Sequence, residues 1–362
     1  MSGRKWNFNP GPSVLPVPAL EKAKEALLSY NGTGIGIMET SHRSKEFDAL
    51  YSGIQARMAR LLGLPPDRKI LFFGGGATLQ FSIVPMNLLP AGGHADYVDT
   101  GTWAGAAAKA AGLVGKVNVV ATSRDAAGKF PRVPGPDEIN VTEGAAYLHL
   151  CSNNTIAGTQ YHAWPDTGDT PLIVDMSSDI ACRELDWSKF DLVYAGAQKN
   201  LGPAGVTLVI ISQRLLDRCG DTLPMLLNYK TMAAKDSLGN TPPTFPIYMV
   251  GLVLEWLEEL GGVGAIEKVN RTKADLLYDL FDGNADYFRA PVEKGSRSLM
   301  NVVWRLPNED LEKQLITEAT ADGFAGLKGH RSVGGLRASI YNAMPLEGVE
   351  RLVDYLRKFA AK

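Results

Sequence analysis

Apolar runs alternate with segments of helical periodicity along most of the chain, which predicts a mainly parallel β-sheet covered by helices. The clearest helix spans 45–62, where apolar side chains recur every three or four positions. A second predicted helix, 103–111, is rich in alanine. The predicted strands lie at 70–73, 96–99, 117–121, 146–150, 172–175, 192–195 and 206–211. We therefore expect an α/β fold.

The pattern changes towards the C-terminus, where strands become sparse and long helices are predicted over 245–260 and 267–281. Beyond them, strands at 301–304 and 336–340 and helices at 310–321 and 347–359 indicate a small α+β unit. We expect an arm over 1–15, a large domain over 16–262 and a small domain over 263–362. The N-terminal segment is predicted to be extended because it is rich in proline, with Pro10, Pro12, Pro16 and Pro18.

Composition narrows the class of protein. The 362 residues are 45% hydrophobic and 21% charged, and the net charge of −2 gives no footprint for nucleic acid or an anionic membrane. No apolar segment follows the basic residues near the N-terminus, and the apolar run 247–254 is too short for a membrane span. The three cysteines and five histidines form no CxxC pair or histidine cluster, so neither a disulfide framework nor a metal site is expected. We expect a cytoplasmic protein.

The main chemical signal is a lysine between two predicted strands and an aspartate that ends another. Lys199 stands among small and apolar residues, and Asp175 closes the strand 172–175. Burial would lower the pKa of the Lys199 amine and make it nucleophilic, as Schiff-base chemistry requires. A carboxylate at a strand end would keep a pyridine nitrogen protonated. The pair therefore indicates an enzyme that uses pyridoxal 5'-phosphate (PLP).

Three further features fit such a cofactor. The glycine turn 74–76 joins a strand to a helix, and backbone N–H groups there can approach a phosphate, although the same turn is as often purely structural. Trp103 follows the loop 99–102, where an indole can stack on a ring or pack in the core. Thr155 follows the strand 146–150, at the edge where open α/β sheets bind ligands. PLP needs both a phosphate site and contacts to its ring.

Basic residues form two clusters that are typical of anion binding. One is His42-Arg43, and the other is His330-Arg331 with Arg337 six residues further along. Arginine binds carboxylates and phosphates through two parallel N–H groups, and a neighbouring histidine adds a donor. Two clusters suit a substrate that carries more than one anionic group.

With these residues identified, the chain resembles the phosphoserine aminotransferases, PLP enzymes of fold type I within the class-V aminotransferase family. The resemblance covers nearly the whole chain and rests on the order of many short motifs, which lie at 7–12, 41–44, 74–81, 152–158, 175–179, 196–200, 240–244 and 329–339. The chain departs from many members, which have Arg or Cys and then Gly where it has Ala77-Thr78-Leu79. This leaves open one anionic contact at the mouth of the site.

The resemblance implies a role for each candidate. Lys199 would hold the cofactor and shuttle a proton, and Asp175 would pair with the pyridinium nitrogen. The other cofactor-binding residues would be Gly76, Ala77, Trp103, Thr155, Gln198, Asn240 and Thr241, the last two reaching the cofactor of a neighbouring subunit in a homodimer. The substrate-binding residues would be His42, Arg43, His330, Arg331 and Arg337.

The reaction implied is the transfer of the amino group from L-glutamate to 3-phosphohydroxypyruvate, which gives O-phospho-L-serine and 2-oxoglutarate in L-serine biosynthesis. Arg337 would bind the α-carboxylate, and the His-Arg pairs would receive the phosphate or the distal carboxylate of glutamate. Some members also aminate a phosphorylated hydroxythreonine in pyridoxine biosynthesis, a second activity that the sequence leaves open.

Other interpretations remain at this stage. A serine–pyruvate or alanine–glyoxylate aminotransferase needs one carboxylate clamp only, which leaves the second basic cluster without a purpose. A PLP desulfurase would need a mobile loop cysteine, whereas Cys151 and Cys182 lie close to strand ends. A Rossmann-type nucleotide-binding protein accounts for the glycine turn but not for Asp175 and Lys199, and the chain lacks GxGxxG followed by an acidic residue.

Overall fold

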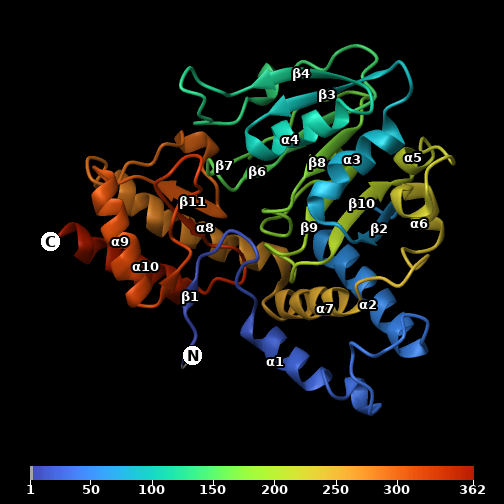
Figure 1. The fold of residues 1–362 in the computed structure, drawn as a ribbon, viewed down its shortest axis with the longest axis horizontal. Helices are drawn as coiled ribbons and strands as arrows, with labels where there is room; N and C mark the ends of the chain where they lie inside the picture. The colour runs from blue at the N-terminus through green and yellow to red at the C-terminus, as the bar shows by residue number, and fades with distance from the viewer. Residues whose placement is uncertain (1–2) are drawn as a thin grey trace.

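A computed structural model describes residues 3–362, and a seven-stranded sheet forms its centre (Figure 1). The strands follow the order β2-β10-β9-β8-β5-β3-β4, and all run parallel except β10, which is antiparallel to both neighbours. Their bounds are β2 Arg68–Phe73, β3 His94–Asp99, β4 Lys116–Thr122, β5 Leu148–Cys151, β8 Leu172–Asp175, β9 Leu192–Gly196 and β10 Thr207–Ser212. A short hairpin, β6 Asn153–Asn154 and β7 Thr159–Gln160, follows β5.

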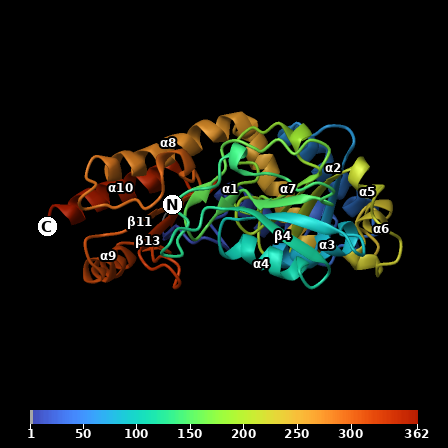
Figure 2. The ribbon, with the colours of Figure 1, turned by 90° about the horizontal axis from the view of Figure 1, so that it is seen from above.

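Helices cover both faces of the sheet because the central strands are apolar on both sides. In β8, Leu172 and Val174 pack in one hydrophobic cluster, whereas Ile173 packs in the cluster on the opposite face. The first cluster includes side chains of α2 Lys45–Leu62, α7 Thr244–Glu259 and the start of α8 Gly262–Asp282. The second includes α3 Gly76–Leu88, α4 Thr102–Ala111, α5 Gln213–Leu216 and α6 Tyr229–Ala234. Figure 2 shows α3 and α4 on one side of the sheet and α7 and α8 on the other.

The C-terminal part of the chain forms a third hydrophobic cluster, which we call the small-domain cluster. It contains the antiparallel pair β11 Asn301–Trp304 and β13 Leu336–Ser339, with α9 Glu309–Ala321 and α10 Leu346–Ala360. Helix α8 joins the large domain to the small domain. Val263, at its start, packs in the first cluster beside the sheet, and Leu277 packs in the small-domain cluster. The boundary predicted between residues 262 and 263 therefore falls at the start of a helix that is shared by both clusters.

The N-terminal arm runs through the small-domain cluster before it reaches the large sheet. Strand β1 Trp6–Asn7 pairs in parallel with β12 Phe324–Ala325, and Phe8 is fully buried among the small-domain side chains. The arm then passes the loop after β9, where the Ser13 backbone N–H donates to the carbonyl oxygen of Gln198 at 3.0 Å. It therefore links the two clusters at their junction.

The backbone is extended at Pro16, with φ of −59° and ψ of 131°, but the prediction of extended backbone at Pro18 is wrong. Helix α1 Val17–Ala26 begins directly after Pro16, with Pro18 in its first turn. Proline fits there because its fixed φ is helical and the first N–H groups of a helix have no partner within the helix. Throughout the described residues, no helix combines the length and apolar character needed to cross a bilayer.

Candidate active site

The parallel strands bring their carboxyl ends to one edge of the sheet, where nine of the predicted site residues line a single cavity. Its volume is about 220 Å³. The nine are Gly76, Ala77, Trp103, Thr155, Asp175, Gln198, Lys199, His330 and Arg337. The carboxyl ends of β2, β3, β5, β8 and β9, with the turns and helix starts that follow them, supply seven of them, and the small domain supplies the other two. The edge is the usual ligand position in open α/β sheets.

Lys199 lies three residues after the end of β9, in a turn that the N-terminal arm covers. The hydroxyl of Ser13 donates to the backbone oxygen of Lys199, and Gly11 lies so close that a Cβ there would come within 3.2 Å of Lys199 Cγ. The ammonium group is 5.8 Å from the centre of the Trp103 ring. Burial lowers the pKa of Lys199, and the Asp175 carboxylate opposes that shift.

Asp175 is buried at the end of β8, and its orientation is fixed by the residue two positions later. The backbone N–H and the hydroxyl of Ser177 both donate to Asp175 Oδ1, at 2.9 and 2.6 Å. Burial raises the pKa of Asp175, while the positive charge of Lys199 opposes that shift. One carboxylate oxygen is thus held by Ser177, and no donor within residues 3–362 bonds the other.

A glycine turn and an aromatic ring form further parts of the cavity wall. Gly75 and Gly76 have φ of 83° and 70°, a left-handed conformation that only glycine adopts easily, and they start α3 at the cavity. The first N–H groups of such a helix can bind an anion. Across the cavity, Trp103 Nε1 donates to Thr155 Oγ1 at 3.2 Å, which fixes the orientation of the indole.

Arg337 is the buried cation of the cavity. It extends from β13, and its Nη1 donates to the backbone oxygen of Thr155 at 2.7 Å. Within residues 3–362 it forms no ion pair, and its Nε is buried without a hydrogen-bond partner. Burial lowers the pKa of Arg337. A buried guanidinium without a carboxylate partner is costly unless a ligand anion pairs with it.

Five predicted residues lie outside this cavity. His42 and Arg43 precede α2, Asn240 and Thr241 lie between α6 and α7, and Arg331 is beside His330 but does not line the wall. Arg43, Asn240, Thr241 and Arg331 are exposed, and His42 is partly buried.

Sequence reasoning missed several lining residues. Ser177 received no role, although its position two residues after a strand-ending aspartate is a readable signal for a hydrogen bond to that carboxylate. Pro10 and Gly11 also line the cavity, yet they are more than 180 positions from Lys199, and only the folded chain brings them there.

Comparison with known proteins identifies the family to which the chain belongs. The family model of class-V aminotransferases matches residues 5–352. A phosphoserine aminotransferase of Desulfosudis oleivorans is 54% identical over 361 residues, which is 99% of each chain. The chain belongs to the phosphoserine aminotransferase family. It is therefore a transaminase, and the resemblance drawn from its motifs is confirmed, whereas the nucleotide-binding alternative is wrong.

Solved structures agree with this placement and confirm the predicted fold class. The phosphoserine aminotransferase of Bacillus circulans subsp. alkalophilus superposes with a TM-score of 0.96 at 50% identity, covering 99% of each chain. A structure of the Trichomonas vaginalis enzyme, described as PLP-bound, superposes with a TM-score of 0.92 at 35% identity, covering 98% of this chain and 100% of that one. The α/β architecture is thus that of PLP fold type I.

Proposed function

We propose that this protein binds PLP and transfers the amino group of L-glutamate to 3-phosphohydroxypyruvate, forming O-phospho-L-serine and 2-oxoglutarate. The observation that carries the proposal is that Lys199, Asp175 and the ion-pair-free Arg337 line one cavity. A nucleophilic amine, a ring-nitrogen partner and a carboxylate clamp are the groups that transamination needs. The relatives at about half identity over the whole chain support the same reaction.

The residues present fit PLP. The free oxygen of Asp175 would accept the hydrogen bond of the ring nitrogen, the Trp103 indole would cover the ring, and Thr155 Oγ1 would bond its hydroxyl. The start of α3 at Gly76 and Ala77, together with Gln198, would hold the phosphate. When bound, PLP supplies an electron-withdrawing ring that stabilises negative charge at the substrate α-carbon.

The chain's own groups would perform the remaining work. Arg337 would bind the α-carboxylate through the N–H groups that no protein partner occupies, and this contact would orient the α-carbon hydrogen towards Lys199. The Lys199 amine would take that proton from the α-carbon and return it on the cofactor side, as a general base and then a general acid. Its lowered pKa favours the neutral amine that the first step requires.

Recognition of the second anionic group would fall to His330, Arg331, His42 and Arg43. His330 lines the cavity, and burial together with the charges of Arg337 and Arg331 lowers its pKa. This cluster would receive the phosphate of phosphoserine or the distal carboxylate of glutamate. A phosphorylated hydroxythreonine carries the same pair of anionic groups, so it is a second substrate to test in the same assay.

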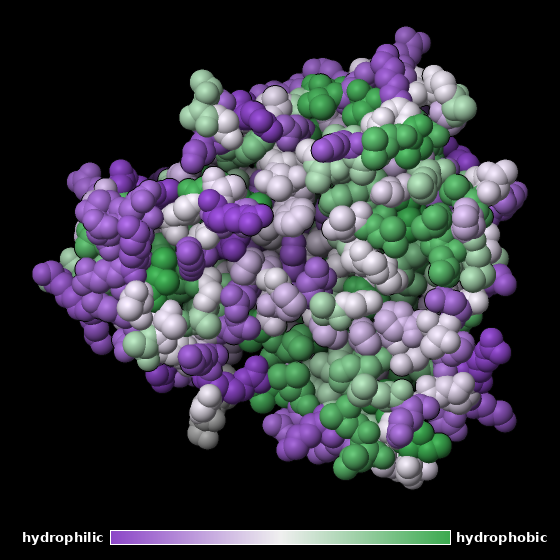
Figure 3. All heavy atoms as spheres, viewed as in Figure 1, coloured by the Kyte–Doolittle hydropathy of each residue, from purple (hydrophilic) through white to green (hydrophobic). Residues whose placement is uncertain are grey.

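We infer further that the working form is a homodimer in which Asn240 and Thr241 of one subunit complete the cofactor phosphate site of the other. Two observations support this. These residues are exposed and lie outside the cavity of their own chain. Apolar side chains are also exposed after α1, where Leu28 is 85% and Met38 63% exposed. Figure 3 shows hydrophobic surface along the lower edge of the molecule.

A visible absorption spectrum tests the proposal. We expect purified protein supplied with PLP to show the band of the bound cofactor, and O-phospho-L-serine to change that band while L-serine does not. Equal responses to both amino acids would mean that the basic residues do not recognise phosphate, and a serine–pyruvate type of activity would then replace the proposal. A protein that takes up no PLP would exclude both.

A further inference from the structure

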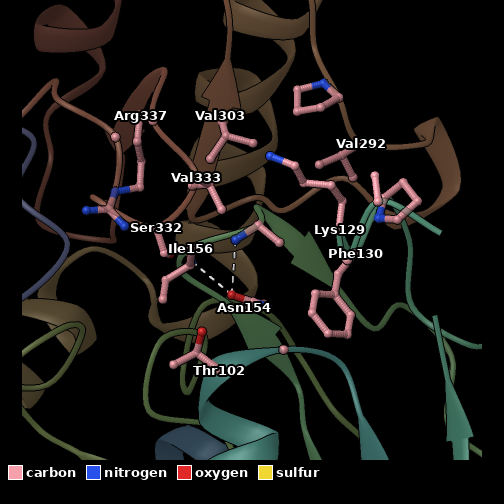
Figure 4. A pocket seen from close by; sticks show the side chains of 18 of the residues that line it. Thr102, Lys129, Phe130, Asn154, Ile156, Val292, Val303, Ser332, Val333 and Arg337 are labelled. Atoms are coloured by element: carbon pink, nitrogen blue, oxygen red, sulfur yellow. Dashed lines mark hydrogen bonds between the residues drawn. The ribbon is translucent and has the colours of Figure 1, made fainter. Parts of the chain in front are cut away.

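The loop 329–335 contributes to the walls of two cavities, the cofactor cavity and a larger one of about 680 Å³. His330 lines the first cavity, Ser332, Val333 and Gly334 line the second, and Arg337 lines both. Figure 4 shows Ser332 and Val333 at the larger cavity, close to Ile156. Because this side of the loop faces a cavity rather than packed side chains, packing alone does not hold it in place.

Hydrogen bonds within the loop 329–335 hold it in a compact conformation. The Gly329 N–H donates to the carbonyl oxygen of Gly335 at 2.9 Å, and the Gly334 N–H donates to the carbonyl oxygen of His330 at 2.8 Å. His330 Nδ1 is 2.7 Å from the hydroxyl of Ser332. These hydrogen bonds make the loop a single compact unit, so the position of the imidazole depends on how that unit is attached to the rest of the molecule.

Arg305 provides such an attachment. Its Nη1 donates to the carbonyl oxygen of Val333 at 2.8 Å, and its Nε donates to Glu312 Oε1 at 2.7 Å. Glu312 is buried on α9 and also accepts from the Leu306 N–H at 3.2 Å, so the carboxylate is fixed on two sides. The guanidinium connects the loop to a helix of the small domain.

The loop also fits Arg305 closely. Gly335 has φ of 70°, and a Cβ added there would come within 2.5 Å of Arg305 Cδ. A glycine is therefore needed where the loop backbone crosses the arginine stem. Arg305 lines the larger cavity but not the cofactor cavity, so its contact with the reaction is indirect.

We propose that Arg305, held by Glu312, is a positioning residue for substrate recognition. It fixes the 329–335 loop, and through it His330 and Arg331, which bind the second anionic group of the substrate. This inference rests on the proposed function, because only that function gives His330 and Arg331 an anion to bind. Arg305 itself touches neither substrate nor cofactor.

Two conservative variants test the idea in the PLP-loaded, full-length enzyme. Arg305→Lys keeps the charge but lacks the planar fork that reaches Val333 and Glu312 together, and Glu312→Gln keeps an acceptor without its charge. We expect Arg305→Lys to raise the KM for O-phospho-L-serine ten- to hundredfold, which is the order of effect of losing one hydrogen bond to a charged group. The kcat at saturation should stay within about twofold, since Lys199 and Arg337 are untouched.

Inorganic phosphate is the second probe. Its inhibition constant against O-phospho-L-serine should rise by a factor similar to that of the KM in Arg305→Lys, and by a smaller factor in Glu312→Gln. Lys313→Gln on the same helix is the matched control, because Lys313 pairs with the exposed Asp310 rather than with Arg305 or the loop. It should leave both constants unchanged.

The outcomes separate the two proposals. Loss of kcat at unchanged KM, or unchanged constants in folded Arg305→Lys, overturns the positioning role. If Arg305→Lys does not fold, Glu312→Gln at the wild-type melting temperature decides by the same criterion. A wild-type enzyme that does not transaminate O-phospho-L-serine overturns the proposed function itself, whatever the variants do.

Discussion

Two groups of predicted residues differ sharply in how the chain holds them. The strand-end group comprises Gly76, Trp103, Thr155, Asp175 and Lys199. These residues lie at the ends of buried strands or in the turns and helix starts that follow them, and they line one cavity. The outer group, which comprises His42, Arg43, Asn240 and Thr241, lies in loops between helices and outside that cavity. One chain thus assembles the first group completely and leaves the second on its surface.

The difference indicates what each group can do alone. A side chain in the strand-end group is oriented by short hydrogen bonds, as Asp175 is by Ser177, so its geometry exists before any ligand arrives. Exposed side chains such as Asn240 have no comparable support within residues 3–362 and would gain theirs from a second subunit. We therefore expect substitutions in the strand-end group to reduce the rate of transamination, and substitutions in the outer group to weaken cofactor binding.

The largest effect is expected at Lys199. Lys199→Arg keeps a positive charge beside Asp175 but removes the nucleophilic amine, so transamination of O-phospho-L-serine should fall by at least about 10³-fold. The assay is the initial rate with 2-oxoglutarate as acceptor. Lys189→Arg, an exposed lysine ten residues earlier, is the matched control and should keep full activity. Residual activity above a tenth of wild type would remove Lys199 from the chemistry.

A smaller effect is expected at Asn240. If Asn240 binds the cofactor phosphate as proposed, Asn240→Ala would remove one hydrogen bond to a charged group, and the dissociation constant of PLP should rise by about tenfold. Equilibrium dialysis measures it, and Asn284→Ala on the exposed end of the small domain serves as control.

The homodimer itself is tested by mixing subunits. Hybrids of Asn240→Ala and Lys199→Arg subunits should contain one site with both native groups, so mixing should restore activity that neither variant has at limiting PLP. No gain on mixing would mean that the outer group does not act across an interface.

The smallest effect concerns the sheet beneath the cavity. His149 is buried in β5, its Nε2 is 2.9 Å from the Tyr194 hydroxyl, and burial lowers its pKa to about 3. Below its ordinary pKa of 6.5 the unfolded chain binds a proton that the folded chain does not, so stability falls as the pH drops from 6.5 towards 3. The slope is about 1.4 kcal/mol per pH unit.

His149→Phe removes this contribution. Between about pH 6.5 and 5, wild type should lose about 2 kcal/mol more unfolding free energy than the variant. Urea denaturation at the two pH values measures the difference. Tyr194→Phe removes the hydrogen-bond partner but keeps the imidazole, so it should retain the wild-type pH dependence. Equal slopes in wild type and His149→Phe would contradict the assignment.

Local signals explain how much of the fold was predictable. Helix α2 has the predicted bounds because Ser44 caps its start, where its hydroxyl accepts from the Phe47 N–H, and Gly63 ends it in a left-handed conformation. The positions of Asp175 at a strand end and of Lys199 in the turn after a strand were also predictable from local sequence, because strand and turn residues are adjacent in the chain. Helix α1 could not be predicted in this way, because prolines are typical both of extended backbone and of the first turn of a helix.

The features that could not be predicted depend on contacts between residues far apart in the sequence. Nothing near Phe8 indicates that it packs in the small domain, and nothing near Arg305 indicates that Val333 and Glu312 converge on it. Such contacts depend on packing between segments far apart in sequence, which periodicity and spacing do not encode. The sequence therefore predicted nine of the residues that line the cavity, but not the arm that covers it or the contacts that support it.

The contacts of the N-terminal arm determine when, during synthesis of the chain, the active site can be completed. Trp6 leaves the ribosome well before Phe324, its partner in the β1–β12 pair, because 318 positions separate the two residues in the chain. At about 5–20 residues per second, roughly 16 to 60 seconds of synthesis separate the two. During that interval the cover over Lys199 has no small domain to anchor it. A nascent chain that stops short of residue 324 should therefore carry every strand-end residue and still lack a finished active site.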